Sequence, residues 1–424
     1  MFFTQVLTAP ILLAYLALAG FFTSKLKHFS GLKLGAEKMF WGAICKNAAF
    51  FFFAVLSALM MAQIIFNSFF TPISSWDTLQ TWAGWSIDFL AYESSGAGFG
   101  SSWSHPRHPP TVYHLMAFNG FAFSESTLLQ GLLLPWLFAW ICGGVVVFGF
   151  VLAISNSTTL SMASTYLYTS LPLLENHGML LGYIDLLVAV SVAGATAMLA
   201  FSVHYRSLKF ALFGMVFSSA LLLLKNTAVL YISSMWIPLA IIYLGYVSQR
   251  NLVLGIALAL LIGVWILVVG FDFTFAGARY ALVVGSPSLV SFGGWTHEVN
   301  GLLVLEALWS QFWAFFIEQS FSTLMLGGVV ILWARGQASA DEAMRFTRGG
   351  DFVIAAGVFM LVAFTLPQMF SHDYYQNYAA PGLDTGNSRF LMAVGPVFVM
   401  MLAFVSKPTS ALNMSDSLRS RKAG

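Results

Sequence analysis

Charged residues are scarce in this chain of 424 residues, where Asp, Glu, Lys and Arg together make up 8% and hydrophobic residues 58%. A soluble domain carries about a quarter charged residues. The scarcity therefore excludes an ordinary soluble fold and predicts an integral membrane protein. The chain also shows no signature of a nucleic-acid-binding protein, so no nucleic-acid partner is expected.

Cysteine is scarcer still, with only Cys45 and Cys142. Both lie in apolar runs, which argues against a disulfide framework or a cysteine metal site. The first apolar run, at about 5–22, has neither a basic preceding segment nor a small-residue cleavage site. It is therefore predicted to be a membrane span rather than a cleaved signal peptide.

What the chain has in abundance is long apolar stretches. About 11 of them are long enough to cross roughly 30 Å of hydrocarbon. They lie at about 5–22, 44–68, 127–154, 157–174, 182–203, 210–224, 227–247, 252–270, 319–334, 352–370 and 389–405. The predicted fold is an all-α integral membrane protein, a single polytopic domain over 1–424. Its longer external loops are expected at about 69–126, 271–318 and 371–388.

Basic residues concentrate on one side of this topology. All but four of the 19 Lys and Arg residues fall there, the exceptions being Arg107, Lys225, Arg279 and Arg389. Because basic loops stay in the cytoplasm, the C-terminus is predicted inside and the N-terminus outside. Most of the 17 acidic residues and eight histidines fall on the external side. Chemistry is expected on that side, although the orientation rule itself leaves acids free to lie there.

The first external loop opens with "SSWDTLQTWAGWSIDFL", residues 74–90. On a helical wheel, residues 76–90 place Trp76, Trp82 and Trp85 on a broad apolar arc and the aspartates opposite. This pattern predicts an amphipathic helix in the membrane interface, with tryptophan at headgroup depth. Asp77 and Asp88 are about three turns apart and share its polar face. The alternative is a plain interfacial helix whose carboxylates are solvated.

A histidine-proline stretch, "SHPRHPPTVYHL", follows at residues 104–115, and its His105, Arg107, His108 and His114 bring hydrogen-bond donors close to the membrane. Proline stiffens this part of the loop. Histidines interrupted by prolines and without cysteine partners are a poor pattern for zinc. Arg107 between two histidines suits a phosphate better.

Three further charged residues stand at the ends of apolar runs. Asp185 begins a long span, where a carboxylate either faces a polar cavity or interacts with the helix dipole as a first-turn acid. Lys225, in "LLLLKNTAVLY", either faces a polar pocket or extends to the outer interface. Arg389 opens the last span, as a simple anchor or as an inward phosphate ligand.

The order of these motifs resembles the bacterial branch of the GT-C glycosyltransferases, multispanning enzymes that use polyprenyl-phosphate-linked sugars. The resemblance covers roughly residues 40–230 and depends on four short motifs. These are the Trp-Asp pair in "SSWDTLQTWAGWSIDF", the histidine-proline stretch, "PLLENHGMLLGYIDLL" and the Lys-Asn pair in "LLKNT". It implies a GT-C-like fold in a bacterial inner membrane with a periplasmic active site.

The resemblance also implies roles for individual residues. Asp77 matches the first-loop catalytic aspartate, Asp185 the "GYxD" acid and Lys225 the lysine of the Lys-Asn pair. Relatives often carry an acid after that pair, where this chain has Thr227. Asp77 and Asp185 are the predicted catalytic residues. The predicted substrate-binding residues are Asp88, His105, Arg107, His108, Tyr113, Lys225 and Arg389.

The expected reaction moves a hexose or pentose from a polyprenyl phosphate to a hydroxyl of a glycan, glycolipid or protein. A phosphate leaves without a general acid, so one carboxylate base suffices, whereas a glycosidase needs two. Direct displacement inverts the anomeric carbon. The leaving phosphate needs positive charge, which Lys and Arg supply and a divalent cation could assist. The alternatives are a lipid-linked glycan polymerase or ligase and a transporter, which would show inverted repeats and midplane titratable groups.

Overall fold

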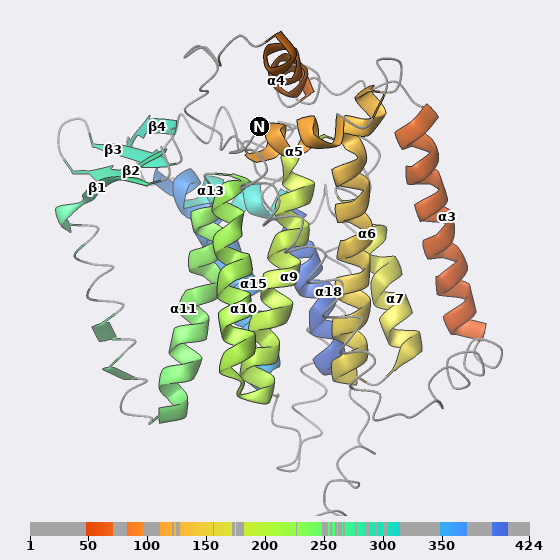
Figure 1. Cartoon of the computed structure of the whole chain (residues 1–424). Helices are drawn as coiled ribbons and strands as arrows, with labels where there is room; N and C mark the ends of the chain where they lie inside the picture. The colour runs from red at the N-terminus through yellow and green to blue at the C-terminus, as the bar shows by residue number, and fades with distance from the viewer. Residues whose placement is uncertain are drawn as a thin grey trace, which may run out of the picture.

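The computed structural model describes most of the helical core of the chain. The described residues are 48–70, 83–95, 111–120, 123, 128–155, 157–171, 174, 182–225, 227–247, 270–275, 278–284, 288–292, 295–299, 304–313, 348–370 and 392–405, with scattered positions between 253 and 269. The described part is mostly helical, and its helices form a bundle (Figure 1).

Three of the described helices are long and apolar enough to cross a membrane: α3 (Ala48–Phe70), α6 (Leu128–Ser155) and α9 (Ile184–Tyr205). Four further helices accompany them, α10 (Leu208–Ala220), α11 (Ala228–Val247), α15 (Arg348–Phe370) and α18 (Val394–Val405), whose described apolar stretches are 10–17 residues long. By length and composition, the three long apolar helices indicate a membrane protein.

The structure does not support the predicted count of about 11 spans. The expected spans at 5–22 and 319–334 lie outside the described residues, and the one at 252–270 is described only in part. The expected span at 157–174 contains α7 (Thr158–Thr169), whose 12 residues cover only about 18 Å. Ser157 caps α7 by accepting a hydrogen bond from the Leu160 amide at 3.2 Å, and Ser170 ends it.

Helix α9 is the centre of the bundle. It packs against α6, α10, α11, α15 and α18 and is buried along most of its length. Its middle is rich in alanine, which allows neighbouring backbones to approach closely. On α10, a Cβ added at Gly214 would lie 2.4 Å from Leu199 Cδ2, so the α9–α10 contact requires glycine there.

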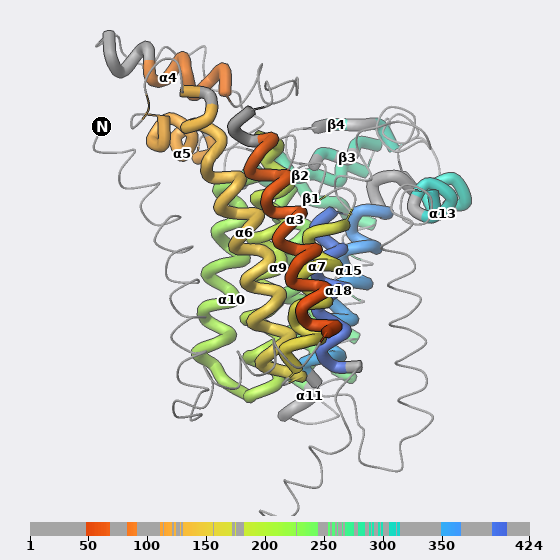
Figure 2. The backbone as a smooth tube through the Cα atoms, turned by 90° about the vertical axis from the view of Figure 1, so that its right-hand side faces the viewer, coloured from red at the N-terminus to blue at the C-terminus, as the bar shows by residue number. Residues whose placement is uncertain are grey.

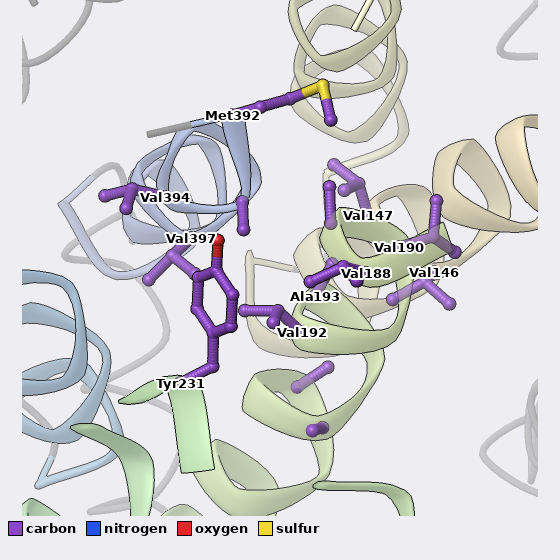
Figure 3. Packing of buried hydrophobic residues seen from close by; sticks show 14 of the residues in the cluster. Val146, Val147, Val188, Val190, Val192, Ala193, Tyr231, Met392, Val394 and Val397 are labelled. Atoms are coloured by element: carbon purple, nitrogen blue, oxygen red, sulfur yellow. The ribbon is translucent and has the colours of Figure 1, made fainter. Parts of the chain in front are cut away.

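Figure 3 shows how the core closes around α9. Val188 and Val192 of α9 lie between Val147 of α6, Tyr231 of α11 and Val397 of α18. Large apolar side chains at the periphery face outward instead, such as those of Phe51, Leu59 and Phe66 on α3, which are 57%, 61% and 60% exposed. Large apolar side chains are thus found both in the core and on the outer surface, as is possible where the surrounding solvent is hydrocarbon.

Several elements gather at one end of the bundle (Figures 1 and 2). They are α4 (Gly84–Ser95), α5 (Thr111–Gly120), α13 (Val304–Phe312) and a four-stranded sheet. We call this the cap end and the opposite one the far end. Helix α9 runs from the cap end to the far end, α10 returns, and α11 descends again, with the 3₁₀ turn η4 (Leu221–Leu223) between α10 and α11.

Charges separate between the two ends. Arg206 and Lys209, in the turn from α9 to α10, lie at the far end, where α15 begins at Arg348. Lys225 and Arg279 lie at the cap end. The described acidic residues other than Asp351 also lie at the cap end: Asp88, Glu93, Asp185, Asp272, Glu298 and Glu306.

The sheet corrects the all-α prediction. Strands β1 (Phe271–Phe275), β2 (Ala278–Val283), β3 (Leu289–Phe292) and β4 (Trp295–Glu298) pair in sequence order as an antiparallel meander. They fall in the second predicted external loop. Antiparallel hairpins need connections of only a few residues, and the four strands fit within one loop between helices.

Candidate functional site

The structure describes three of the predicted site residues with their side chains: Asp88, Asp185 and Lys225. Tyr113 lies in α5, but its side chain is not described. Asp77, His105, Arg107, His108 and Arg389 lie outside the described residues.

Asp185 is the second residue of α9, at the cap end. Its position is set from α6, because Trp136 donates a hydrogen bond from Nε1 to the Tyr183 carbonyl at 2.6 Å. Trp136 itself is fully buried. A carboxylate in the first turn of a helix interacts favourably with the helix dipole. The place of Asp185 in α9 therefore agrees with the first-turn alternative.

Lys225 is held in the turn between η4 and α11. Its amide donates to the Leu221 carbonyl at 3.1 Å, and its own carbonyl accepts from the Ala228 amide at 3.0 Å. The first bond ends the η4 turn and the second starts α11. This short connection turns the chain at the depth where α9 begins.

The structure brings these two residues together, although they are 40 residues apart in the sequence. Lys225 Nζ lies 2.5 Å from Asp185 Oδ1, and the side chains are only 15% and 5% exposed. Lys225 therefore does not extend to the interface as a lone anchor. Asp185 is both a first-turn acid and the partner of a buried cation.

Hydrogen bonds between helices hold the two halves of the ion pair in place. On α11, Trp236 donates from Nε1 to Ser218 Oγ of α10 at 2.7 Å. Tyr243 donates from its hydroxyl to the Ser202 carbonyl of α9 at 3.3 Å. These bonds lock α11 against α9 and α10, and they fix where Lys225 meets Asp185.

Thr227 lies beside the pair in sequence, at the position where the resembling family often has an acid. Its Oγ1 atom is buried and has no hydrogen-bond partner among the residues that the structure describes. Threonine carries no charge, so the charge of Lys225 is balanced by Asp185 rather than by a carboxylate from its own turn.

Helices α4 and α5 lie over the cap end and pack against each other. Ala83, Ser86 and Phe89 form the buried face of this segment, and Trp85 packs against the same core. Part of the Trp85 side chain therefore contacts protein, and its position at headgroup depth stays a prediction. The positions of Trp76 and Trp82 in the predicted helix at 76–90 lie outside the described residues.

Asp88 is half-buried on α4, next to Phe89. The Phe89 ring packs on the His114 ring of α5 with a centroid distance of 4.9 Å. Burial lowers the pKa of His114 from 6.5 to about 4, because the charged imidazolium is poorly solvated there. His114 is therefore neutral at pH 7 and brings no charge to this segment.

Within the described ranges, no three His, Cys, Asp or Glu side chains are grouped closely enough to hold a metal ion. The predicted site residues that the structure brings together are Lys225 and Asp185. Sequence reasoning singled out each residue but missed their pairing. The signal was present: two opposite charges, each costly in an apolar environment, stand at ends of spans that reach the same side.

Comparisons with protein-family models, with curated proteins and with solved structures return no match to the chain. The resemblance to the GT-C glycosyltransferases therefore depends on the four sequence motifs alone.

Proposed function

We propose that this protein is a membrane glycosyltransferase that moves a sugar from a polyprenyl phosphate to a hydroxyl acceptor. The observation that carries the proposal is the Asp185–Lys225 ion pair at the cap end of the bundle. It joins two of the three residues that match the family motifs. It also presents a cation beside the membrane surface, where a lipid-linked phosphate lies.

Lys225 is the proposed ligand of the donor phosphate. An ammonium group has three N–H donors, so a bond to Asp185 is compatible with a further contact to a phosphate oxygen. The leaving phosphate gains negative charge as the sugar bond breaks, and a positioned cation stabilises that charge. Arg107 and Arg389 are proposed as further phosphate ligands.

The pairing changes the role proposed for Asp185. A carboxylate that is 5% exposed and bonded to an ammonium group is poorly placed to accept a proton from an acceptor hydroxyl. Asp185 is better suited to positioning Lys225. Asp77 is the proposed general base, with Asp88, His105, His108 and Tyr113 binding the sugar or the acceptor.

The proposal includes a topology. The cap end is external, or periplasmic in a bacterial inner membrane, because the basic turn with Arg206 and Lys209 lies at the far end. The N-terminus is external and the C-terminus cytoplasmic, with about 11 spans in all. The ion pair lies at the end of α9 rather than at its middle, and this favours an enzyme acting at a surface over a transporter.

The test is the release of free polyprenyl phosphate by the purified protein from a panel of polyprenyl-phosphate sugars, with an acceptor extract present. Asp77→Asn is expected to lower turnover about 10²–10⁴-fold while donor binding and the unfolding midpoint stay unchanged. Asp272→Asn is the matched control, since Asp272 is an exposed acid at the same end.

Absence of release with every donor would overturn the proposed reaction. If release occurs and Asp77→Asn keeps more than about a tenth of the turnover, Asp77 is not the base. Loss of activity in the Asp272→Asn control would mean that the assay responds to any lost acid at the cap end.

A further inference from the structure

Helix α13 has two faces of opposite character. Ala307 and Ser310 are buried, at 0% and 2% exposure. The opposite side of the helix carries an apolar stripe with the spacing of one helical face. The stripe consists of Leu305, Leu308, Trp309 and Phe312, which are 79%, 52%, 52% and 43% exposed.

This arrangement is the reverse of a helix on a water-soluble protein, whose large apolar side chains face the core. On α13 the small residues face the protein and the large ones face away. Small residues at the protein contact and large apolar residues outside are typical of helices in lipid. Trp309 stacks on Phe312 with a centroid distance of 5.4 Å, so the outward aromatic rings form one continuous surface.

The position of α13 fits a membrane boundary. It packs against α15, and both views place it at the cap end, level with the ends of the bundle helices (Figures 1 and 2). The face of α15 that looks outward carries Val358 and Val362, which are 47% and 50% exposed. Both helices of this contact therefore expose large apolar side chains. The nine residues of α13 span only about 14 Å, too little to cross a bilayer.

We propose that α13 lies in the plane of the membrane interface, with the stripe of Leu305, Leu308, Trp309 and Phe312 inserted among the acyl chains of the cap-end leaflet. Tryptophan favours this depth. The helix contains one acid, Glu306, and no basic residue. Its attachment to lipid therefore depends on buried apolar area and not on anionic headgroups. The proposal is independent of the reaction that the protein catalyses.

The test is site-directed spin labelling of the full chain in nanodiscs, in a Cys45→Ala, Cys142→Ala background. Single labels are introduced by Leu305→Cys, Leu308→Cys and Phe312→Cys, with Glu306→Cys as the matched control on the same helix. We expect the three stripe labels to collide at least several times more often with oxygen than with a water-soluble nickel chelate. The label at position 306 is expected to show the opposite preference.

Three results would overturn the proposal. Nickel collision rates at the stripe equal to those at position 306 would show that the stripe faces water. Low collision rates with both reagents would show that it is covered, by a second copy or by another segment. The collision rates of the stripe labels are also compared between zwitterionic nanodiscs and nanodiscs in which one fifth of the lipid is anionic. A change in these rates would contradict attachment through buried apolar area.

A second measurement avoids the cysteine variants. Tryptophan emission is measured for the wild type and for Trp309→Phe in lipids brominated near the headgroup or near the bilayer centre. The difference between the two spectra is the emission of Trp309. We expect that difference spectrum to be quenched by shallow bromine labels and quenched less by labels near the bilayer centre. A difference spectrum that no brominated lipid quenches would overturn insertion.

Discussion

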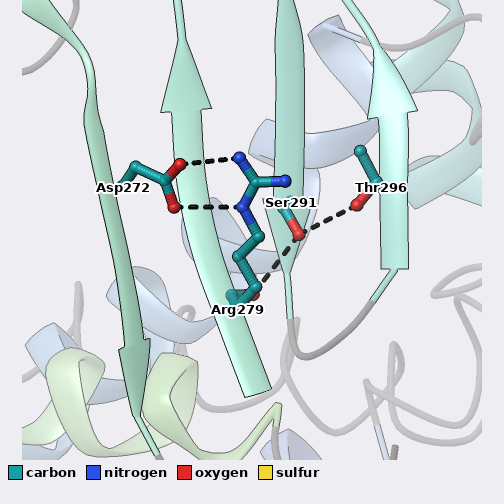
Figure 4. Close-up of polar contacts among 4 residues, drawn as sticks. All are labelled: Asp272, Arg279, Ser291 and Thr296. Atoms are coloured by element: carbon teal, nitrogen blue, oxygen red, sulfur yellow. Dashed lines mark hydrogen bonds and ion pairs between the residues drawn. The ribbon is translucent and has the colours of Figure 1, made fainter.

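Among the residues that the structure describes, two ion pairs at the cap end differ in hydrogen-bond geometry and in exposure. Arg279 donates two hydrogen bonds to Asp272, from Nε to Oδ1 at 3.0 Å and from Nη2 to Oδ2 at 2.6 Å (Figure 4). Lys225 makes a single bond to Asp185. The better hydrogen-bond geometry is thus in the sheet, where the side chains are 47% and 49% exposed.

The comparison indicates that burial, more than hydrogen-bond geometry, determines how strongly the loss of one partner of an ion pair lowers the free energy of unfolding. Water competes for the Asp272 and Arg279 charges and screens them. The Asp185 and Lys225 charges have lost most of their water, so each depends on the other. On the neighbouring strands, Ser291 donates to the backbone carbonyl of Arg279 at 3.3 Å and Thr296 donates to Ser291 at 3.1 Å, and neither bond involves the charged groups of the pair.

The largest expected effect comes from removing one partner of the buried pair. Lys225→Met leaves the Asp185 carboxylate buried without its cation, and the free energy of unfolding should fall by about 3–5 kcal/mol. The double variant Asp185→Leu, Lys225→Met removes both charges, and its stability should return close to that of the wild type. Thermal unfolding in detergent measures both, with Arg279→Met as the exposed control.

The same variants separate structural and functional roles. If the proposed function is right, the double variant is folded yet fails to release polyprenyl phosphate. Full activity in the double variant would show that Lys225 and Asp185 serve only the fold. Equal destabilisation by the single and double variants would contradict the reading of the pair as mutually dependent.

A smaller effect is expected from titrating His114. Its folded pKa of about 4 lies below the unfolded value of 6.5, so the unfolded chain takes up a proton at a higher pH. Stability is therefore complete above pH 6.5 and decreases as the pH falls from 6.5 toward 4. His114→Phe should flatten this part of the curve of unfolding midpoint against pH, since Phe packs on Phe89 and does not titrate. An unchanged slope in the variant would assign the pH dependence to another group.

The smallest effect is expected in the sheet. The hydrogen bond from Arg279 holds the pKa of Asp272 below its ordinary value. The stability that Asp272 contributes is therefore present at neutral pH and lost as the pH falls through that lowered pKa. At pH 7, Arg279→Met should leave the unfolding midpoint within experimental error, and 1 M salt should remove any residual difference. A loss as large as that of Lys225→Met would contradict the contrast between the pairs.

The long apolar helices could be predicted closely from the sequence. The expected spans at 182–203 and 227–247 correspond to α9 and α11 at 184–205 and 228–247. Helix α7 lies within the expected span at 157–174 but ends at Thr169. Its serine and threonine hydroxyls donate to carbonyls of the preceding turn, as Ser161 does to Ser157 and Thr165 to Ser161, so these polar residues are tolerated inside the helix.

The sheet was missed although its signals are in the sequence. "FDFTF" at 271–275 alternates in the strand period. The Gly293-Gly294 pair in the sequence is typical of a hairpin turn. Strands of only four residues, such as β3 and β4, give a much weaker sequence pattern than an apolar span of about 20 residues.

The two described members of the predicted site that pair, Asp185 and Lys225, were singled out from the sequence one at a time, because a charge in an apolar run is costly. Their opposite charges at the same side made a pairing possible, but which residues meet depends on how α9, α10 and α11 pack. The burial of His114 likewise follows from the packing of Phe89 on its ring, which the sequence motif does not indicate.

The 40-residue separation between Asp185 and Lys225 has a consequence for biogenesis. When α9 emerges from the ribosome, Lys225 has not yet been made, and Asp185 would enter lipid with no counter-charge. Polar residues are expensive in a lone inserting helix. We therefore expect α9 to remain in the insertion machinery until α10 and the start of α11 arrive. The three helices would then leave together, as one unit of assembly.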